Sequence, residues 1–168
     1  MANAITNIDL ANLHTAIGLK LSEAFPAFKL VEFYREEEER AAPKESELPA
    51  LLLEMTEMEP DPDVDPGTEQ LAVIARFEAR IVINFRTPKA KVEVRKMAGA
   101  LAAFIHKNRR FHGLPTGAAD IDAIVSDDFY PELDRFQVWR VDFSMIVHLG
   151  DTIWTNDEPL EFEPVYSW

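Results

Sequence analysis

The first residues that could carry chemistry are Asp61, Asp63 and Asp65, which alternate through a proline-rich segment. Acidic ligands at alternate positions open a calcium-binding EF-hand loop, which also needs Gly at its sixth position and Glu at its twelfth. Counted from Asp61, these two positions hold Pro66 and Ala72. The spacing therefore favours a solvated hairpin loop over a calcium site.

A second acidic cluster consists of Asp120, Asp122, Asp127 and Asp128. Carboxylates of this kind can hold magnesium for phosphoryl chemistry. No basic or Gly-rich segment lies beside them to cradle a phosphate, so ordinary turn and capping roles are favoured. A divalent-metal enzyme stays open as a hypothesis, and it predicts a magnesium- or manganese-dependent activity that is lost in Asp120→Ala.

The histidines do not form a recognisable site. His106 and His112 flank a basic stretch, but zinc would need two further convergent ligands. His148 lies on the less apolar face of an expected strand. The sequence contains no HExxH, P-loop, GxGxxG or nucleophile-elbow motif. We therefore expect no enzyme activity and assign no catalytic residue, metal ligand or cofactor.

Hydrophobic periodicity predicts the elements that would position these residues. Apolar residues spaced by three and four predict a helix over residues 8–24, which Pro26 ends. Strands are expected at residues 28–34, 48–58, 69–85 and 135–149, with a shorter one at 119–125. Residues 60–67 contain three prolines and a glycine, and therefore predict the turn of a hairpin or a protruding loop.

A second helix is predicted to begin with Thr87 as N-cap and Pro88 as its first residue, and to run to about His106. Its core stripe would be Val94, Ala98, Leu101 and Ile105. The predicted fold class is α+β, with a mostly antiparallel, four- to five-stranded sheet, two helices packed on it and long acidic loops. One domain would span residues 1–155, followed by an extended acidic and aromatic tail at residues 156–168.

Length and composition set the broad class of the protein. The chain has 168 residues and no cysteine, which excludes disulfides and thiolate metal sites and fits a cytosolic setting. The first residues lack the basic start and apolar run of a signal peptide, so none is expected. No apolar run approaches the roughly 18 residues of a membrane span.

Charge is distributed unevenly along the chain, whose net charge is −13. Residues 86–110 contain eight basic residues and one acid, whereas residues 32–69 contain fourteen acids and three bases. Opposite charges on two regions permit a heterologous contact between copies, which can close into a ring. Two solvated faces are an equally good interpretation of charge alone. The residues assigned to a subunit or partner interface are Arg86, Lys89, Lys91, Arg95, Lys96, Glu36, Glu37, Glu38, Glu39, Asp61, Asp63, Asp65, Trp154 and Trp168.

The order of these elements resembles that of the tail terminator (tail completion) proteins of long-tailed bacteriophages, including Mu-like phages and phage-tail-like bacteriocins. Three passages carry the resemblance: the opening helix with the short strand and residues 49–54, the long strand that runs into the helix after Thr87-Pro88, and residues 137–143 followed by Leu149-Gly150 and Trp154. It covers roughly residues 8–155.

The resemblance implies a structural protein that needs no cofactor. Family members form a ring, usually a hexamer, that ends the tail tube and stops its polymerisation. The implied partners are further copies of the chain, the tail tube protein, the head–tail connector or neck protein and, in a contractile tail, the sheath. DNA would pass through without specific binding, and no membrane is involved. The implied location is the head-proximal end of the virion tail, after synthesis in the cytoplasm of the bacterial host.

Two further alternatives remain open beside the divalent-metal enzyme. The chain could be another neck or baseplate structural protein of a phage or phage-like particle. It could also be a monomeric regulator that binds nucleic acid through residues 86–110, in which case its affinity would fall steeply with salt.

Overall fold

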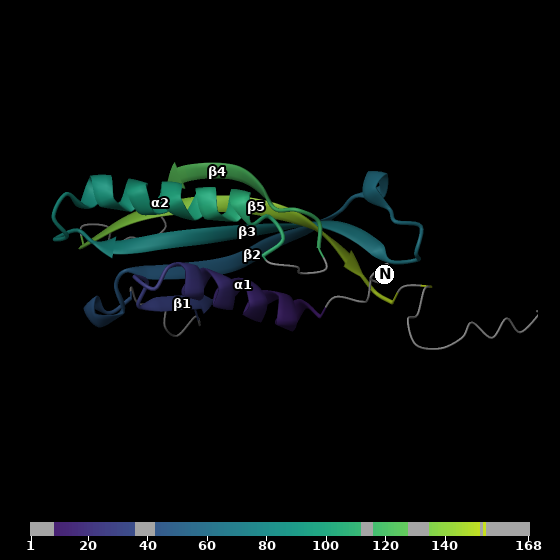
Figure 1. Ribbon diagram of the computed structural model, residues 1–168, viewed down its shortest axis with the longest axis horizontal. Helices are drawn as coiled ribbons and strands as arrows, with labels where there is room; N and C mark the ends of the chain where they lie inside the picture. Colours follow the sequence, from purple (N-terminus) through teal and green to yellow (C-terminus); the bar gives the residue numbers. More distant parts are fainter. Residues whose placement is uncertain (1–8, 36–42, 112–115, 128–134, 152, 154–168) are drawn as a thin grey trace, which may run out of the picture.

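The computed structural model describes residues 9–35, 43–111, 116–127, 135–151 and 153 of the chain. They form one layer of sheet with two helices on it (Figure 1). The elements are α1 (Leu10–Ala24), β1 (Leu30–Phe33), the 3-10 turn η2 (Glu45–Glu47), β2 (Ala50–Pro60), the 3-10 turn η3 (Pro62–Val64), β3 (Leu71–Asn84), α2 (Ala90–Lys107), β4 (Asp120–Ser126) and β5 (Phe136–Leu149). The predicted α+β class is confirmed.

The sheet has the strand order β1-β2-β3-β5-β4. The pairs β2–β3, β3–β5 and β4–β5 are antiparallel, which confirms the prediction of a mostly antiparallel sheet. The pair β1–β2 is parallel, which the expectation of consecutive hairpin-like neighbours did not include. A parallel pair needs a connection of about a dozen residues or more, and residues 34–49 between the two strands are long enough to provide it.

Both helices cover the same face of the sheet (Figure 1). On α1, Leu13, Ile17 and Leu21 are buried, and α2 buries the predicted stripe of Val94, Ala98, Leu101 and Ile105 together with Ala90 and Ala102. Both sets join the alternate residues of β3 from Val73 to Ile83 in one hydrophobic core. The residues at odd positions of β3 therefore face the helices, since side chains alternate along a strand.

The opposite face of the sheet, called the open face below, carries a smaller apolar cluster near the end of β3. Ala50, Val82 and Val138 lie side by side across β2, β3 and β5, and Leu48, Leu52 and Phe136 pack with them. Farther along the same face towards the β2–β3 turn, the residues become charged. The open face therefore changes from apolar to ionic along the length of the sheet.

The start of α2 differs from the prediction. Lys89, not Thr87, is the N-cap residue, and it adopts a left-handed conformation with φ of 54°. Lys89 therefore does not belong to the first helical turn, whereas Lys91 does. The reason lies in the end of β3, because the amide groups of Arg86 and Thr87 bond the side-chain oxygen and the carbonyl of Asn84. Thr87 is thus part of a turn, and the helix can begin only after Pro88.

Tyr34 fastens α1 to β2 at the point where β1 ends. Its hydroxyl lies 2.7 Å from Nε2 of His14 on α1 and accepts a hydrogen bond of 3.3 Å from the amide of Met55. Beside Met55 the pairing of β2 with β3 shifts by a bulge between Met55 and Glu57. Burial raises the pKa of the Tyr34 hydroxyl, and the nearby Glu54 carboxylate raises it further against the opposing effect of the Met55 hydrogen bond.

Candidate subunit interface

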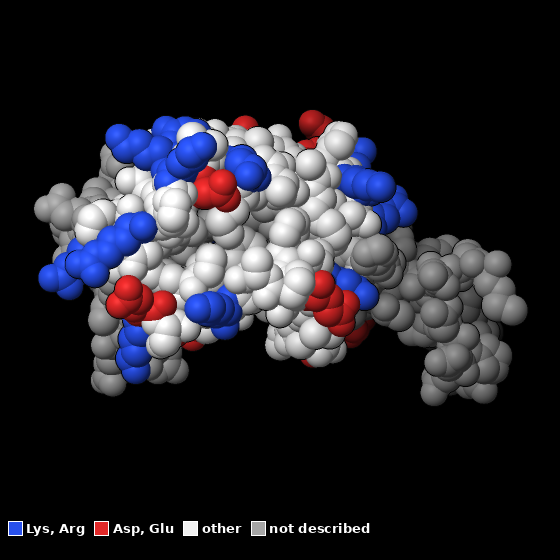
Figure 2. Space-filling model, turned by 60° about the vertical axis from the view of Figure 1, so that its left-hand side comes forward, with Lys and Arg blue, Asp and Glu red and all other residues white. Residues whose placement is uncertain are grey.

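One end of the domain is basic. We define the basic end as Arg86, Lys89, Lys91, Arg95 and Lys96, which lie in the connection between β3 and α2 and in the first two turns of α2, and all five are exposed. Figure 2 turns the side of the molecule with the β3–α2 connection forward, and blue side chains predominate over red on the upper left of this view. The structure thus brings together the five cations that the sequence assigned to an interface.

The basic end also exposes apolar side chains. Phe85 and Val92 are 46% and 54% exposed, respectively. The guanidinium of Arg86 lies over the Phe85 ring at 5.6 Å, and that of Arg95 lies over the Trp139 ring at 4.8 Å. Large exposed apolar groups rimmed by charge are typical of protein-binding surfaces. Lys96 pairs with Glu93 at 3.2 Å, whereas Arg86, Lys89 and Lys91 form no ion pair with the residues that the structure describes.

The opposite end of the domain is acidic. We define the acidic tip as residues 60–67, the connection between β2 and β3, which holds Asp61, Asp63 and Asp65. Asp61 accepts a hydrogen bond from the amide of Asp63 at 3.0 Å, and Asp65 accepts one from the amide of Gly67 at 2.8 Å. These bonds confirm the hairpin loop and give two of the three aspartates a turn-forming role.

The acidic tip and the basic end cannot neutralise each other within one molecule. They lie at opposite ends of β3, which has 14 residues and therefore spans roughly 45 Å. Figure 1 shows the connection between β2 and β3 at one end of the sheet and the start of α2 at the other. Because charges are screened over about 8 Å at physiological salt, the two ends do not interact in the monomer.

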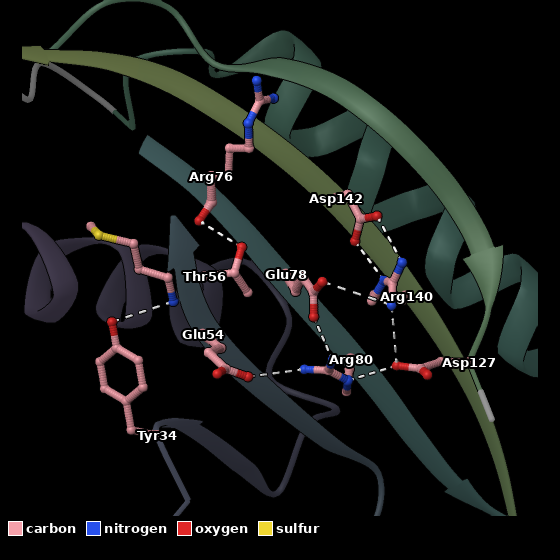
Figure 3. A network of polar contacts seen from close by, with 10 residues as sticks. Tyr34, Glu54, Thr56, Arg76, Glu78, Arg80, Asp127, Arg140 and Asp142 are labelled. Atoms are coloured by element: carbon pink, nitrogen blue, oxygen red, sulfur yellow. Dashed lines mark hydrogen bonds and ion pairs between the residues drawn. The ribbon is translucent and has the colours of Figure 1, made fainter. Parts of the chain in front are cut away.

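Between the two ends, the open face holds an ion network that the sequence reasoning missed (Figure 3). Arg80 is buried, and its Nε donates to the buried Asp127 at 2.6 Å. Its Nη1 donates to Glu54 at 3.3 Å, and Nη2 donates to Glu78. Arg140 binds both oxygens of Asp142, at 2.7 and 3.1 Å. These bonds join β2, β3 and β5 to the residue that follows β4.

The register of β3 and β5 places like charges opposite each other, and the ion pairs compensate for their repulsion. Arg80 lies opposite Arg140, and Glu78 lies opposite Asp142, so like charges face each other across β3 and β5. Direct like-charge pairs destabilise a sheet. Diagonal contacts relieve the repulsion, because Arg140 reaches Glu78 at 3.8 Å and Asp127 at 3.9 Å. The hydrogen bonds that Arg140 donates to Asp142, together with the neighbouring carboxylates, raise the pKa of Arg140.

Towards the acidic tip the network becomes exposed. Arg76 lies 3.2 Å from Glu57, 2.8 Å from Glu59 and 4.0 Å from Asp122. The hydrogen bond with Glu59 raises the pKa of Arg76. Arg76 and its three partners form a second cluster, which shares no residue with the cluster of Arg80 and Arg140. Among the described residues, the two clusters of the ion network contain three arginines and seven carboxylates, those of Glu54, Glu57, Glu59, Glu78, Asp122, Asp127 and Asp142. The network therefore carries a net charge of 3 − 7 = −4.

The carboxylates considered for magnesium are held apart by other partners. Asp120 pairs with Arg109, Asp122 accepts a hydrogen bond from Ser144 at 3.2 Å, and Asp127 binds Arg80. Across the described segments, no three His, Cys, Asp or Glu residues converge as a metal site would require. The arrangement gives these carboxylates roles in ion pairs.

Several residues assigned to the interface lie outside the described residues, namely Glu36, Glu37, Glu38, Glu39, Trp154 and Trp168, as do His112 and Asp128. No helix in the described part of the chain is long and apolar enough to cross a membrane.

Comparison with known proteins does not add a family to this description. No family model matches the chain, and no curated protein matches it significantly.

Proposed function

We propose that this protein is a structural tail terminator subunit, which assembles into a ring on the end of a phage-type tail tube and stops the polymerisation of that tube. The observation that carries the proposal is the opposite charge of the two ends of one domain. The acidic tip of one copy would meet the basic end of the next, and Phe85 and Val92 would form the apolar centre of the contact. Such a heterologous contact closes into a ring when its rotation permits.

The open face of the sheet gives further support. In a ring that lets DNA pass, a negative inner wall would repel the phosphate backbone and prevent sticking. The ion network supplies such a wall, because its three arginines are outnumbered by seven carboxylates. The helices on the other face would then lie on the outside, where the connector and a contractile sheath would bind.

The test is the native mass in solution, measured by light scattering with and without the tail tube protein. The proposal predicts a ring of about six copies, either alone or on the end of the tube, and shorter tubes when the protein is present during tube polymerisation. A strict monomer that does not bind the tube would refute it. A ring that ignores the tube would instead favour another neck or baseplate protein.

The exposed cations of the basic end also support a second candidate, a regulator that binds nucleic acid. Binding through several phosphate contacts would weaken steeply as salt rises. Titration of a DNA duplex at two salt concentrations distinguishes the candidates. The terminator proposal predicts negligible DNA binding under conditions in which the protein assembles, because the surface as a whole carries a net charge of −13.

A further inference from the structure

We propose that the outer edge of β4 binds residues 160–163 of a second copy as an added β-strand. The proposal rests on the self-assembly proposed above, and it names a second contact between neighbouring copies. Four observations carry it: an open strand edge, cations beside that edge, a segment of the chain with matching chemistry, and the distance between the two within one copy.

The edge is open in only one half of β4. In the described part of the sheet, β5 is the sole partner of β4. Edge strands are normally protected by charge, proline or shortness. Asp120 and Asp122 protect the first half, whereas residues 123–126 carry no charge or proline. There Ile124 and Val125 are 42% and 37% exposed, and they point to opposite faces because they are consecutive in a strand.

Cations lie beside this open half. Ser126 pairs with Trp139, and the Arg95 guanidinium lies 4.8 Å above the Trp139 ring. Lys91 is one helical turn before Arg95 and is exposed. On the open face, Val125 pairs with Arg140. Arg140 is already paired with Asp142, Glu78 and Asp127, so Arg95 and Lys91 on the helix face are the cations that could meet an acidic partner. An added strand would therefore be favoured if its acidic side chains lay on the helix face and its apolar side chains lay on the open face beside Val125.

The chain contains such a segment. Leu160, Glu161, Phe162 and Glu163 alternate between apolar and acidic, which is the pattern of a strand with two different faces. Residues 156–168 as a whole contain four acids and no lysine or arginine. Pro164, which follows the segment, is compatible with a strand at the edge of a sheet, where its missing amide is not needed.

The distances favour a second copy. The last described residue, Ile153, donates its amide to the carbonyl of Thr68 at 3.1 Å and is therefore fixed near the acidic tip. Ser126 at the far end of β4 lies opposite Trp139 of β5. Trp139 is ten residues before Leu149, so Ser126 lies roughly 34 Å along the sheet from the end of β5 near the tip. The seven residues from Ile153 to Leu160 span at most about 25 Å. Residues 160–163 of the same copy therefore cannot reach residues 123–126 in an antiparallel orientation, which would place Leu160 beside Ser126. A parallel orientation would need a fully extended chain between Ile153 and Leu160.

The same geometry suits a neighbouring copy. Ile153 lies at the acidic tip, and residues 123–126 lie towards the basic end. When the tip of one copy meets the basic end of the next, the departing chain of the first is brought to the open edge of the second. Strand addition through backbone hydrogen bonds, with side chains giving specificity, is a common mode of recognition.

Disulfide cross-linking between full-length chains tests the proposal cleanly, because the chain has no native cysteine. A Val125→Cys chain is mixed in turn with tagged chains that carry Leu160→Cys, Glu161→Cys, Phe162→Cys or Glu163→Cys, and mild oxidation follows. We expect cross-linked heterodimers to exceed the control at least fivefold, with alternate tail positions reacting best. The control replaces Val125→Cys by Leu19→Cys, which is 55% exposed on α1.

Three outcomes would overturn the proposal. The first is heterodimer formation no greater than with the Leu19→Cys control. The second is preferential cross-linking of Val125→Cys to a Met58→Cys chain, which would place the edge of β2 that extends beyond its pairing with β1 on β4 instead. The third is a disulfide bond within one chain that carries both Val125→Cys and Phe162→Cys.

Failure of this inference can be distinguished from failure of the terminator function. A ring that forms without tail cross-links would refute only this inference. Tail cross-links in small oligomers that do not bind the tube would refute only the terminator function.

Discussion

The two ends of the domain differ in what their charges do. At the acidic tip, Asp61 and Asp65 bond backbone amides of their own turn, and the neighbouring Glu57 and Glu59 pair with Arg76. At the basic end, Arg86, Lys89 and Lys91 form no ion pair with described residues, although α2 beneath them is firmly packed. Charge at the tip therefore also stabilises its own fold, whereas the charge of Arg86, Lys89 and Lys91 at the basic end is available to a partner.

The largest expected effect concerns the charges held between the two ends. Arg80→Met would leave Asp127 buried without its nearest cation and would also remove the bonds to Glu54 and Glu78. Breaking a buried pair in this way costs roughly 3–5 kcal/mol. Chemical denaturation of the monomer should show that loss, and should show little change for Arg76→Met, whose partners are exposed. Equal effects of the two variants would contradict the division into buried and exposed halves of the network.

The next effect concerns assembly. Reversing the basic end with Arg86→Glu, Lys91→Glu and Lys96→Glu would place like charges opposite the acidic tip of the neighbour. Because such a contact costs several kcal/mol, the association constant should fall by at least about a hundredfold. Mass photometry over a dilution series measures it, and the fold should be unchanged by circular dichroism.

A matched control has the same change in net charge. Lys29→Glu, Lys107→Glu and Arg110→Glu alter exposed cations outside the basic end. Assembly of this control should match that of the unmodified protein within about threefold, since distant surface charges are screened. A loss as large as that of the end-reversed variant would mean that total charge, and not its position, governs assembly.

The apolar part of the basic end should have a smaller effect. Phe85→Ser and Val92→Ser together remove the exposed apolar centre without touching the core. Truncating central interface residues typically costs more than about 1 kcal/mol, so roughly tenfold weaker association is expected. The same dilution series measures it, with Leu19→Ser as the control. Unchanged association would remove these two residues from the interface.

The smallest effect concerns Tyr34, far from both ends of the contact. Tyr34→Phe loses the hydrogen bonds to His14 and Met55 and should destabilise the monomer by about 1 kcal/mol at neutral pH. Because folding raises the pKa of Tyr34 above its ordinary value of 10.0, its contribution is present below pH 10 and is lost as pH rises beyond that. The difference in the free energy of unfolding between Tyr34→Phe and the unmodified protein should therefore shrink as pH rises, which denaturation at several alkaline pH values measures. A difference that does not change with pH would contradict the assignment.

Much of the fold follows from local patterns. The strands at residues 69–85 and 135–149 and the buried stripe of α2 are confirmed, and the alternation of apolar and polar residues along both strands puts Arg80 and Arg140 on the face opposite the helices. The pairing of Arg80 with Asp127 could not be predicted, because the two are 47 residues apart and meet only through the strand order. Thr87 was misjudged because its capping propensity is overridden by the turn at Asn84.

The central claim is that the tip of one copy binds the basic end of the next. A tip-reversed variant can keep its turn, because Asp61→Asn and Asp65→Asn retain the bonding oxygen while Asp63→Lys and Glu59→Lys reverse the charge. The most direct measurement is the native mass of this variant, of the end-reversed variant and of their equimolar mixture. We predict that each is monomeric alone and that the mixture assembles, because each then meets an opposite charge. A mixture that stays monomeric, or variants that assemble separately, would contradict the account.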